Sequence, residues 1–122
     1  MINFSSAAKA RGTHLRIHFK HCREIGNAIK GKELAKAKKY LENVLEYKEA
    51  IPFTKYTGGI GRHAVAKQYK APGDKVGWPQ KATKTFLDLL RNVEANAEVI
   101  IFYRCSKFIE LLSLLFYFSS TF

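Results

Sequence analysis

Apolar residues recur at steps of three and four along two stretches of the chain, the spacing that places them on one side of a helix. In the first stretch, residues 32–49, these positions are Leu34, Ala37, Leu41, Val44 and Leu45. The second stretch begins at Pro79, which suits the first turn of a helix, and its stripe consists of Thr83, Phe86, Leu87, Leu90, Val93 and Ala97. We therefore predict two long helices, over about residues 32–49 and 79–98.

The segment before these helices carries two shorter patterns. Within residues 14–20, three apolar residues alternate with four polar ones, namely Leu15, Ile17 and Phe19 with His14, Arg16, His18 and Lys20. This alternation is typical of a half-buried strand with one basic face. Helical spacing follows at Cys22, Ile25, Ala28 and Ile29, up to Gly31, which can adopt the left-handed conformation that ends a helix. We predict a strand over residues 14–20 and a short helix near residues 21–30.

Residues 51–80 interrupt both patterns. They contain all three prolines of the chain, Pro52, Pro72 and Pro79, and five of its eight glycines, Gly58, Gly59, Gly61, Gly73 and Gly77. This content argues against long regular elements and predicts a segment that is mostly loop. A loop of that length is uncommon in a compact domain unless a ligand orders it.

The composition changes abruptly after Glu98. Residues 1–98 hold 19 of the 21 basic side chains and 9 of the 10 acidic ones, whereas 16 of the last 24 residues are apolar or aromatic. We predict a basic folded domain over residues 1–98 and a divergent hydrophobic tail over 99–122. The apolar run at 108–118 is shorter than the roughly 20 residues that a membrane span needs, so we do not expect a membrane partner. A core segment, a tail anchor and an aggregation-prone end remain alternatives for this tail.

The charge balance of the chain points to a polyanionic partner. The formal net charge is +11 over 122 residues, while a hydrophobic content of 47% supplies enough apolar material for one folded core. Charge alone does not distinguish RNA, DNA and an anionic membrane. The two cysteines, Cys22 and Cys105, form no CxxC pair, and residues 1–10 lack the apolar stretch of a signal peptide. We therefore expect a reducing compartment, the cytosol or the nucleus.

The loop over residues 51–80 has the composition of an RNA-binding segment. Its basic residues, Lys55, Arg62, Lys67, Lys70 and Lys75, are interleaved with Phe53, Tyr56, Tyr69 and Trp78, and Asp74 is its single acid. Basic side chains can neutralise phosphates, glycines let backbone N–H groups approach them, and aromatic rings can stack on unpaired bases. The alternative interpretation is a solvated loop with an ordinary aromatic anchor.

The sequence contains no convincing motif for binding a cofactor or a metal or for catalysis. Gly59, Gly61 and Ala64 fit a dinucleotide-binding fingerprint only loosely, because no strand–helix–strand unit surrounds them. In the predicted strand, His14 and His18 would lie about 13 Å apart, beyond the reach of one tetrahedral metal ion. The chain has neither a GxSxG nor an HExxH motif. We expect no cofactor, no metal site, no small-molecule substrate and no enzymatic activity.

Three segments nevertheless resemble one known family. They are RGTHLRIHFKHCREIGNAIKGKELAKAKKYLENV, IPFTKYTGGIGRHAVAKQY and GWPQKATKTFLDLLRNVEANAE. Over about residues 9–98 they are similar to the large-subunit ribosomal protein family called L-twenty-two, or L-seventeen in eukaryotes. The resemblance implies an α+β fold of three helices with a small antiparallel sheet. It also implies binding to large-subunit ribosomal RNA near the polypeptide exit tunnel, neighbouring ribosomal proteins as partners, and a cytosolic ribosome with nucleolar assembly.

The resemblance also implies which residues face the RNA. In the first basic stretch and at the start of the last helix they are Arg11, Arg16, His18, Lys20, Arg23, Lys81 and Lys84. In the loop they are Lys55, Tyr56, Gly58, Gly59, Gly61, Arg62, His63 and Lys67.

The chain departs from the family pattern after Glu98. Residues 99–122 show neither the basic residues nor the turn signals of the long hairpin that continues the family fold, so we expect a truncated form without it. Residues 99–103 could then supply a strand partner for residues 14–20. The alternative function is that of a basic RNA- or DNA-binding module outside the ribosome.

Overall fold

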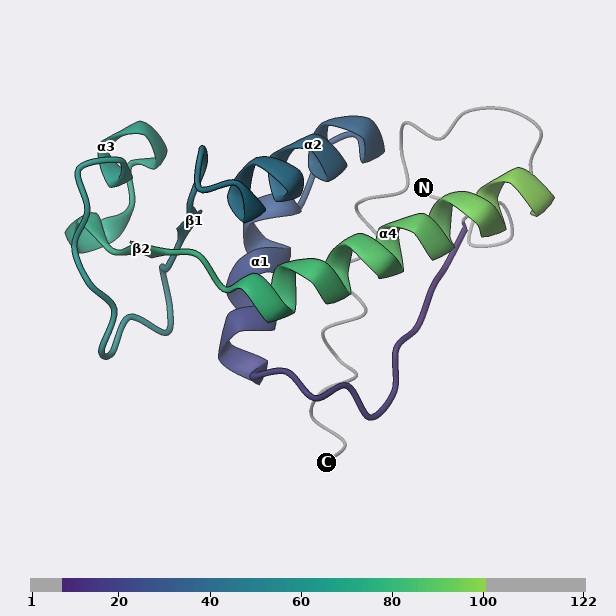
Figure 1. The fold of residues 1–122 in the computed structure, drawn as a ribbon, viewed down its shortest axis with the longest axis horizontal. Coiled ribbons are helices and arrows are strands. Elements are labelled where there is room, and N and C mark those ends of the chain that lie inside the picture. Colours follow the sequence, from purple (N-terminus) through teal and green to yellow (C-terminus); the bar gives the residue numbers. More distant parts are fainter. Residues whose placement is uncertain (1–7, 101–122) are drawn as a thin grey trace.

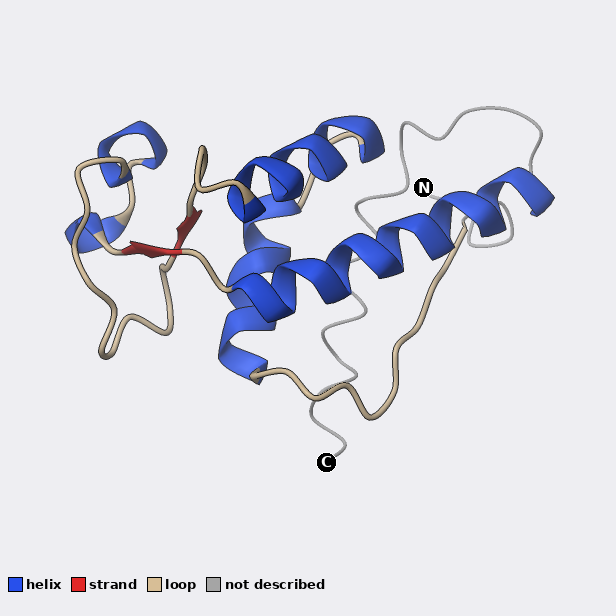
Figure 2. Cartoon of the chain, in the orientation of Figure 1, coloured by secondary structure: helices blue, strands red, loops and turns tan. Residues whose placement is uncertain are grey.

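The computed structural model describes residues 8–100, and of Val99 and Ile100 it describes the backbone alone. In chain order the elements are α1 (Phe19–Ile29), α2 (Leu34–Leu45), β1 (Ile51–Pro52), α3 (Ala66–Tyr69), the 3-10 turn η2 (Pro72–Asp74), β2 (Val76–Gly77) and α4 (Gln80–Ile100). The three long helices gather together, and α3, β1 and β2 form a lobe beside them (Figure 1, Figure 2). The predicted α+β class is confirmed.

The three long helices enclose the main core, and the apolar stripes predicted for them are its buried faces. Ile25 and Ile29 of α1, Leu41 and Val44 of α2, and Leu90 of α4 are fully buried. An ion pair between Lys38 and Glu94 joins α2 to α4 at the edge of this core. The helix periodicity therefore located the packing surfaces correctly.

Helix α2 ends earlier than its pattern predicted. Tyr47, two residues after Leu45, has a φ of +61°, and the N–H groups of Lys48 and Glu49 both donate to the carbonyl oxygen of Asn43. This tight turn redirects the chain into β1. Lys48 and Glu49 therefore do not extend the helix, although lysine and glutamate both have favourable helix propensities.

The strand predicted over residues 14–20 is wrong. Residues 8–18 are extended or bent and have no strand partner within the described part of the chain, and α1 begins at Phe19. A strand needs a neighbour to accept and donate its backbone hydrogen bonds. The start of the segment instead contacts α4, where the Asn96 side-chain amide donates to the Lys9 carbonyl oxygen at 2.7 Å. Ile17 packs against the helical core.

The sheet lies elsewhere, at the two ends of the long loop. Strands β1 and β2 pair antiparallel, with Ile51 opposite Gly77 and Pro52 opposite Val76. A Cβ at Gly77 would lie 2.8 Å from the Phe53 ring, so this register favours a glycine. The prediction of a mostly irregular loop over residues 51–80 is confirmed, because no element within it exceeds four residues.

Aromatic side chains attach this loop to α2 and to the segment that follows it. At the start of β1, the Tyr40 hydroxyl donates to the Ala50 carbonyl oxygen at 2.7 Å, and the Ala50 N–H donates to the Tyr69 hydroxyl at 3.3 Å. The Trp78 indole N–H donates to the Glu49 carbonyl oxygen at 2.9 Å. These contacts connect Tyr69 and Trp78 of the loop to the segment between α2 and β1.

Two further predictions concern the end of the chain. Val99 and Ile100 belong to α4, so they do not form the substitute strand suggested for residues 99–103. The rest of that segment and the predicted tail lie outside the described residues, so the division after Glu98 and the expected lack of the family hairpin stay predictions. Among the described helices, none combines the length and apolar character needed to cross a membrane.

Candidate nucleic-acid interface

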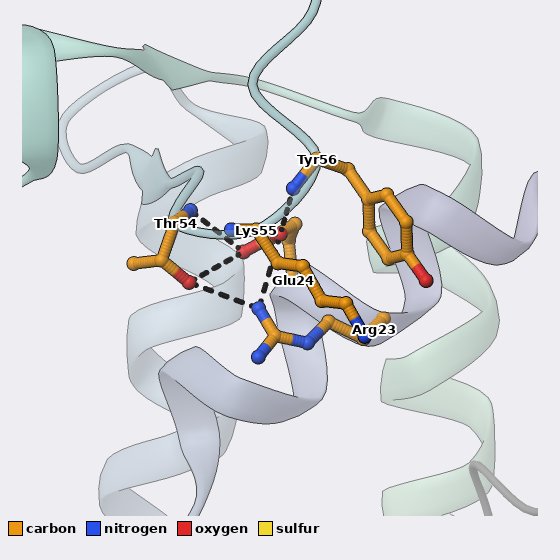
Figure 3. Close-up of polar contacts among 5 residues, drawn as sticks. All are labelled: Arg23, Glu24, Thr54, Lys55 and Tyr56. Carbon is orange, nitrogen blue, oxygen red and sulfur yellow. Dashed lines mark hydrogen bonds and ion pairs between the residues drawn. The ribbon is translucent and has the colours of Figure 1, made fainter.

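A buried carboxylate on α1 holds the first residues of the loop. Glu24 is fully buried, and its Oε1 accepts hydrogen bonds from the backbone N–H groups of Lys55 and Tyr56 at 3.0 and 2.9 Å. Its Oε2 accepts from the backbone N–H and the hydroxyl of Thr54, at 3.0 and 3.3 Å. Three consecutive loop residues are therefore fixed to one side chain of the helix (Figure 3).

Arg23 completes this network from the surface side. Its Nη1 lies 3.1 Å from Glu24 Oε1 and donates to the Thr54 hydroxyl at 2.9 Å. Burial acts to raise the pKa of the Glu24 carboxyl, but the three backbone N–H donors and the adjacent guanidinium outweigh burial and hold this pKa below its ordinary value. Glu24 is therefore an anion at neutral pH. These bonds engage only Nη1, one of the three nitrogens that carry the five N–H donors of a guanidinium.

The network places five residues side by side, Phe19, Lys20, Arg23, Lys55 and Tyr56, which we call the basic-aromatic patch. The ammonium nitrogens of Lys20 and Lys55 lie 5.8 and 5.5 Å from the centre of the Tyr56 ring. The Phe19 and Tyr56 rings meet edge to face, with centres 6.1 Å apart. The Glu24 carboxylate that organises the patch is buried beneath it. The surface of the patch therefore presents cations and aromatic rings.

The glycine-rich part of the loop forms an exposed tip beyond the patch. Gly58, Gly59, Gly61, Arg62 and His63 are all exposed. Gly59 has a φ of +75°, which favours glycine, and a Cβ at Gly58 would meet open space. Packing within the chain therefore does not require glycine at position 58. Its absent side chain leaves the backbone open to an approaching partner.

Three contacts hold this tip to the lobe. Arg62 forms an antiparallel bridge with Lys75, whose ammonium group donates to the Thr57 carbonyl oxygen at 3.2 Å. The His63 ring lies 4.8 Å from the Trp78 ring, edge to face. The tip is therefore tied at its base, while the Arg62 side chain remains exposed.

The other residues predicted to face RNA are spread over the surface. Lys67 is exposed on α3, and Lys81 and Lys84 are exposed near the start of α4. Arg11, Arg16 and His18 are exposed on the segment that precedes α1. The structure thus unites Lys20, Arg23, Lys55 and Tyr56 in one patch, and places the remaining predicted residues on four other parts of the chain.

The histidines and the cysteine within residues 14–22 do not form a metal centre in the described part of the chain. Within residues 8–100, no three His, Cys, Asp or Glu side chains are placed to hold an ion. Burial raises the pKa of the Cys22 thiol to about 11, so this group stays protonated at neutral pH. Burial and the neighbouring His18 lower the pKa of His21, which favours a neutral ring against Phe53.

Comparison with known proteins agrees with the family resemblance. Residues 10–101 match the family model described as Ribosomal protein L22p/L17e. The chain belongs to this family. It is a family of ribosomal proteins and not of enzymes, in agreement with the expectation from the sequence.

Named L22p/L17e relatives come from animals, protists and plants. The chain is 50% identical over 97 residues to the large ribosomal subunit protein uL22 of Suberites domuncula, covering 80% of this chain and 51% of the relative. It is 48% identical over 97 residues to the proteins of the same name from Theileria parva and Zea mays, covering 80% of this chain and 51% and 56% of those relatives. The chain thus spans about half the length of these relatives.

Sequence reasoning missed the residue that organises the patch of this L22p/L17e chain. Glu24 is the only acidic residue among the first 32 and directly precedes the buried Ile25, a combination that could have marked it. Phe19 was assigned to the apolar face of a strand, yet it is 40% exposed beside Tyr56. Thr54 carried no signal of its own, because both its bonds to Glu24 depend on the fold.

Proposed function

We propose that this chain is a structural constituent of the large ribosomal subunit that binds ribosomal RNA near the polypeptide exit tunnel. Family membership supports this proposal, because the relatives are named large ribosomal subunit proteins. Large-subunit ribosomal RNA is the principal partner, and neighbouring ribosomal proteins are further partners. The chain acts in translation on cytosolic ribosomes, with assembly in the nucleolus, and it needs neither a cofactor nor a small-molecule substrate.

The observation that carries the proposal is the basic-aromatic patch above Glu24. Lys20 and Lys55 come from two segments of the chain and lie within 6 Å of the centre of one aromatic ring, and Arg23 bonds to Thr54 next to Lys55. The bonds to Glu24 already fix the backbone that carries Lys55, so phosphate binding there costs less ordering than it would on a free loop. The net charge of +11 adds long-range attraction to any polyanion.

The exposed glycine tip extends this surface. At Gly58 and Gly59 a phosphate can approach the backbone N–H groups closely, Arg62 supplies charge on the same tip, and Lys67 supplies charge on α3. Lys81 and Lys84, with Arg11 and Arg16, provide phosphate contacts on other faces, as expected for a protein embedded among several RNA segments.

Gradient sedimentation tests the proposal. The tagged 122-residue chain is expressed in eukaryotic cells, and lysates are separated on sucrose gradients. We expect the chain to travel with large subunits, and the double charge reversal Lys20→Glu with Lys55→Glu to move it toward the top. The matched control reverses two exposed lysines outside the patch, Lys30→Glu with Lys39→Glu, and should leave sedimentation unchanged.

A basic RNA- or DNA-binding module outside the ribosome would behave differently. Such a protein would stay near the top of the gradient while still binding purified RNA with strong salt dependence. That outcome would contradict a ribosomal role and would favour the alternative.

A further inference from the structure

The basic-aromatic patch has a feature that phosphate binding alone does not require. Phe19 is 40% exposed, and its ring meets the half-buried ring of Tyr56 at 6.1 Å between centres and 67° between planes. Tyr56 is anchored through its backbone N–H to Glu24, so its side chain takes no part in that bond. A surface aromatic pair on a fixed backbone is a platform for another flat, apolar group.

Only a nucleic acid with an exposed base face can stack on this aromatic pair. In an A-form duplex the bases stack on one another, and a protein meets phosphates, 2′-hydroxyls and base edges. Base faces become available in bulges, loops and ends, where an unstacked base can be placed against an aromatic ring. Lys20 and Lys55, both within 6 Å of the Tyr56 ring centre, would then lie beside the phosphates that flank that base.

We propose that the basic-aromatic patch binds one unpaired RNA nucleotide, with its base against Tyr56 and Phe19 and its flanking phosphates at Lys20, Lys55 and Arg23. This inference rests on the proposed function and makes it more specific, because it names the structure of the RNA at this surface. Phosphates are the complement of the three cations, and the Glu24 carboxylate beneath them is buried and already bonded to Thr54, Lys55 and Tyr56.

Two RNA probes test the inference. One is a short duplex with a single unpaired 2-aminopurine, and the other is the same duplex fully paired. Affinity is measured by fluorescence anisotropy at one salt concentration with the full 122-residue chain. We expect tighter binding of the bulged duplex and quenching of its 2-aminopurine fluorescence, because stacking on an aromatic ring quenches that emission.

Variants at position 56 then separate stacking from charge. Tyr56→Leu should weaken binding of the bulged duplex by about 5- to 150-fold, the worth of one base–aromatic stack, and leave the paired duplex unchanged. Tyr56→Phe keeps the ring and should keep the preference. The matched control is Tyr47→Leu, which removes a tyrosine that is 65% exposed outside the patch and should alter neither affinity.

The outcomes distinguish this inference from the proposed function. If the chain binds both duplexes equally and Tyr56→Leu weakens both or neither, the inference is overturned while RNA binding stands. If neither duplex binds and the chain fails to sediment with large subunits, the proposed function itself fails. Thermal unfolding of each variant verifies its fold, and Phe19→Leu, which should also reduce the preference for the bulge, supplies a second measurement should Tyr56→Leu unfold.

Discussion

The Oε1 atom of Glu24 lies 2.9 Å from the backbone nitrogen of Tyr56, a residue 32 positions further along the chain. This bond and its neighbours tie a glycine-rich loop to a helix at the point where basic and aromatic side chains meet. A buried anion under a cationic surface does two things. It fixes the backbone that carries Lys55 and Tyr56, and it contributes no exposed negative charge that would repel a phosphate.

Removal of the Glu24 carboxylate should destabilise the fold. Glu24→Ala leaves three backbone N–H groups without their acceptor and the guanidinium of Arg23 without its anion. We expect a loss of at least about 1–3 kcal/mol in the free energy of unfolding, the cost of one buried donor left unpaired. Urea unfolding measures it, with exposed Glu42→Ala of α2 as the control. Equal stability of the two variants would contradict the role of Glu24.

The same carboxylate should make the chain sensitive to acid. Its pKa is lower in the folded protein than the ordinary 4.5, so the unfolded chain binds the proton more readily. Its contribution to stability is complete above 4.5 and is lost as pH falls through the lower pKa of the folded state. Urea unfolding between about pH 5 and pH 3 should show a smaller decline for Glu24→Gln than for the unchanged chain. Parallel declines would show that Glu24 does not titrate as proposed.

Replacement by alanine should destabilise the fold at Gly77 and have little effect at Gly58. A Cβ at Gly77 meets the buried Phe53 ring at 2.8 Å, whereas one at Gly58 meets nothing within 4 Å. We expect Gly77→Ala to cost about 1–3 kcal/mol of unfolding free energy, as overpacking does. Gly58→Ala should change that free energy by no more than about 0.5 kcal/mol. Thermal melting of both variants checks this, and an unaffected Gly77→Ala would contradict the close approach at β2.

The salt dependence of RNA binding should identify the phosphate contacts. Each phosphate neutralised by a basic side chain contributes about one unit to the slope of log affinity against log salt. Single replacements Lys55→Gln, Arg62→Gln and Lys67→Gln should each reduce that slope by about one for large-subunit ribosomal RNA. Exposed Lys39→Gln on α2 serves as the control. A slope that none of these changes alters would exclude them as phosphate contacts.

The helices could be predicted well because the apolar periodicity that marks the buried face of a helix is visible within one continuous segment. The stripes of α2 and α4 repeat every three to four residues, and the same residues, such as Leu41 and Leu90, are fully buried. The alternation over residues 14–20 is also a local pattern, but the strand predicted from it is wrong. A strand also needs a partner, and no local pattern reveals whether one is present.

The sheet and the patch depend on contacts between distant residues, which explains why they were not predicted. Strands β1 and β2 have two residues each and include Pro52 and Gly77, residues that strand patterns disfavour. The basic and aromatic members of the patch could be identified by composition and family resemblance. Their arrangement could not, because Glu24 reaches residues 30 to 32 positions away.

Lysine acylation with and without purified large-subunit ribosomal RNA tests the central claim most directly. After brief treatment with an amine-reactive reagent, mass spectrometry gives the modification rate of each lysine in the 122-residue chain. We expect RNA to slow modification of Lys20 and Lys55 strongly and to leave exposed Lys39 of α2 unchanged. Equal rates at Lys20 and Lys55 with and without bound RNA would contradict the assignment of this surface to RNA.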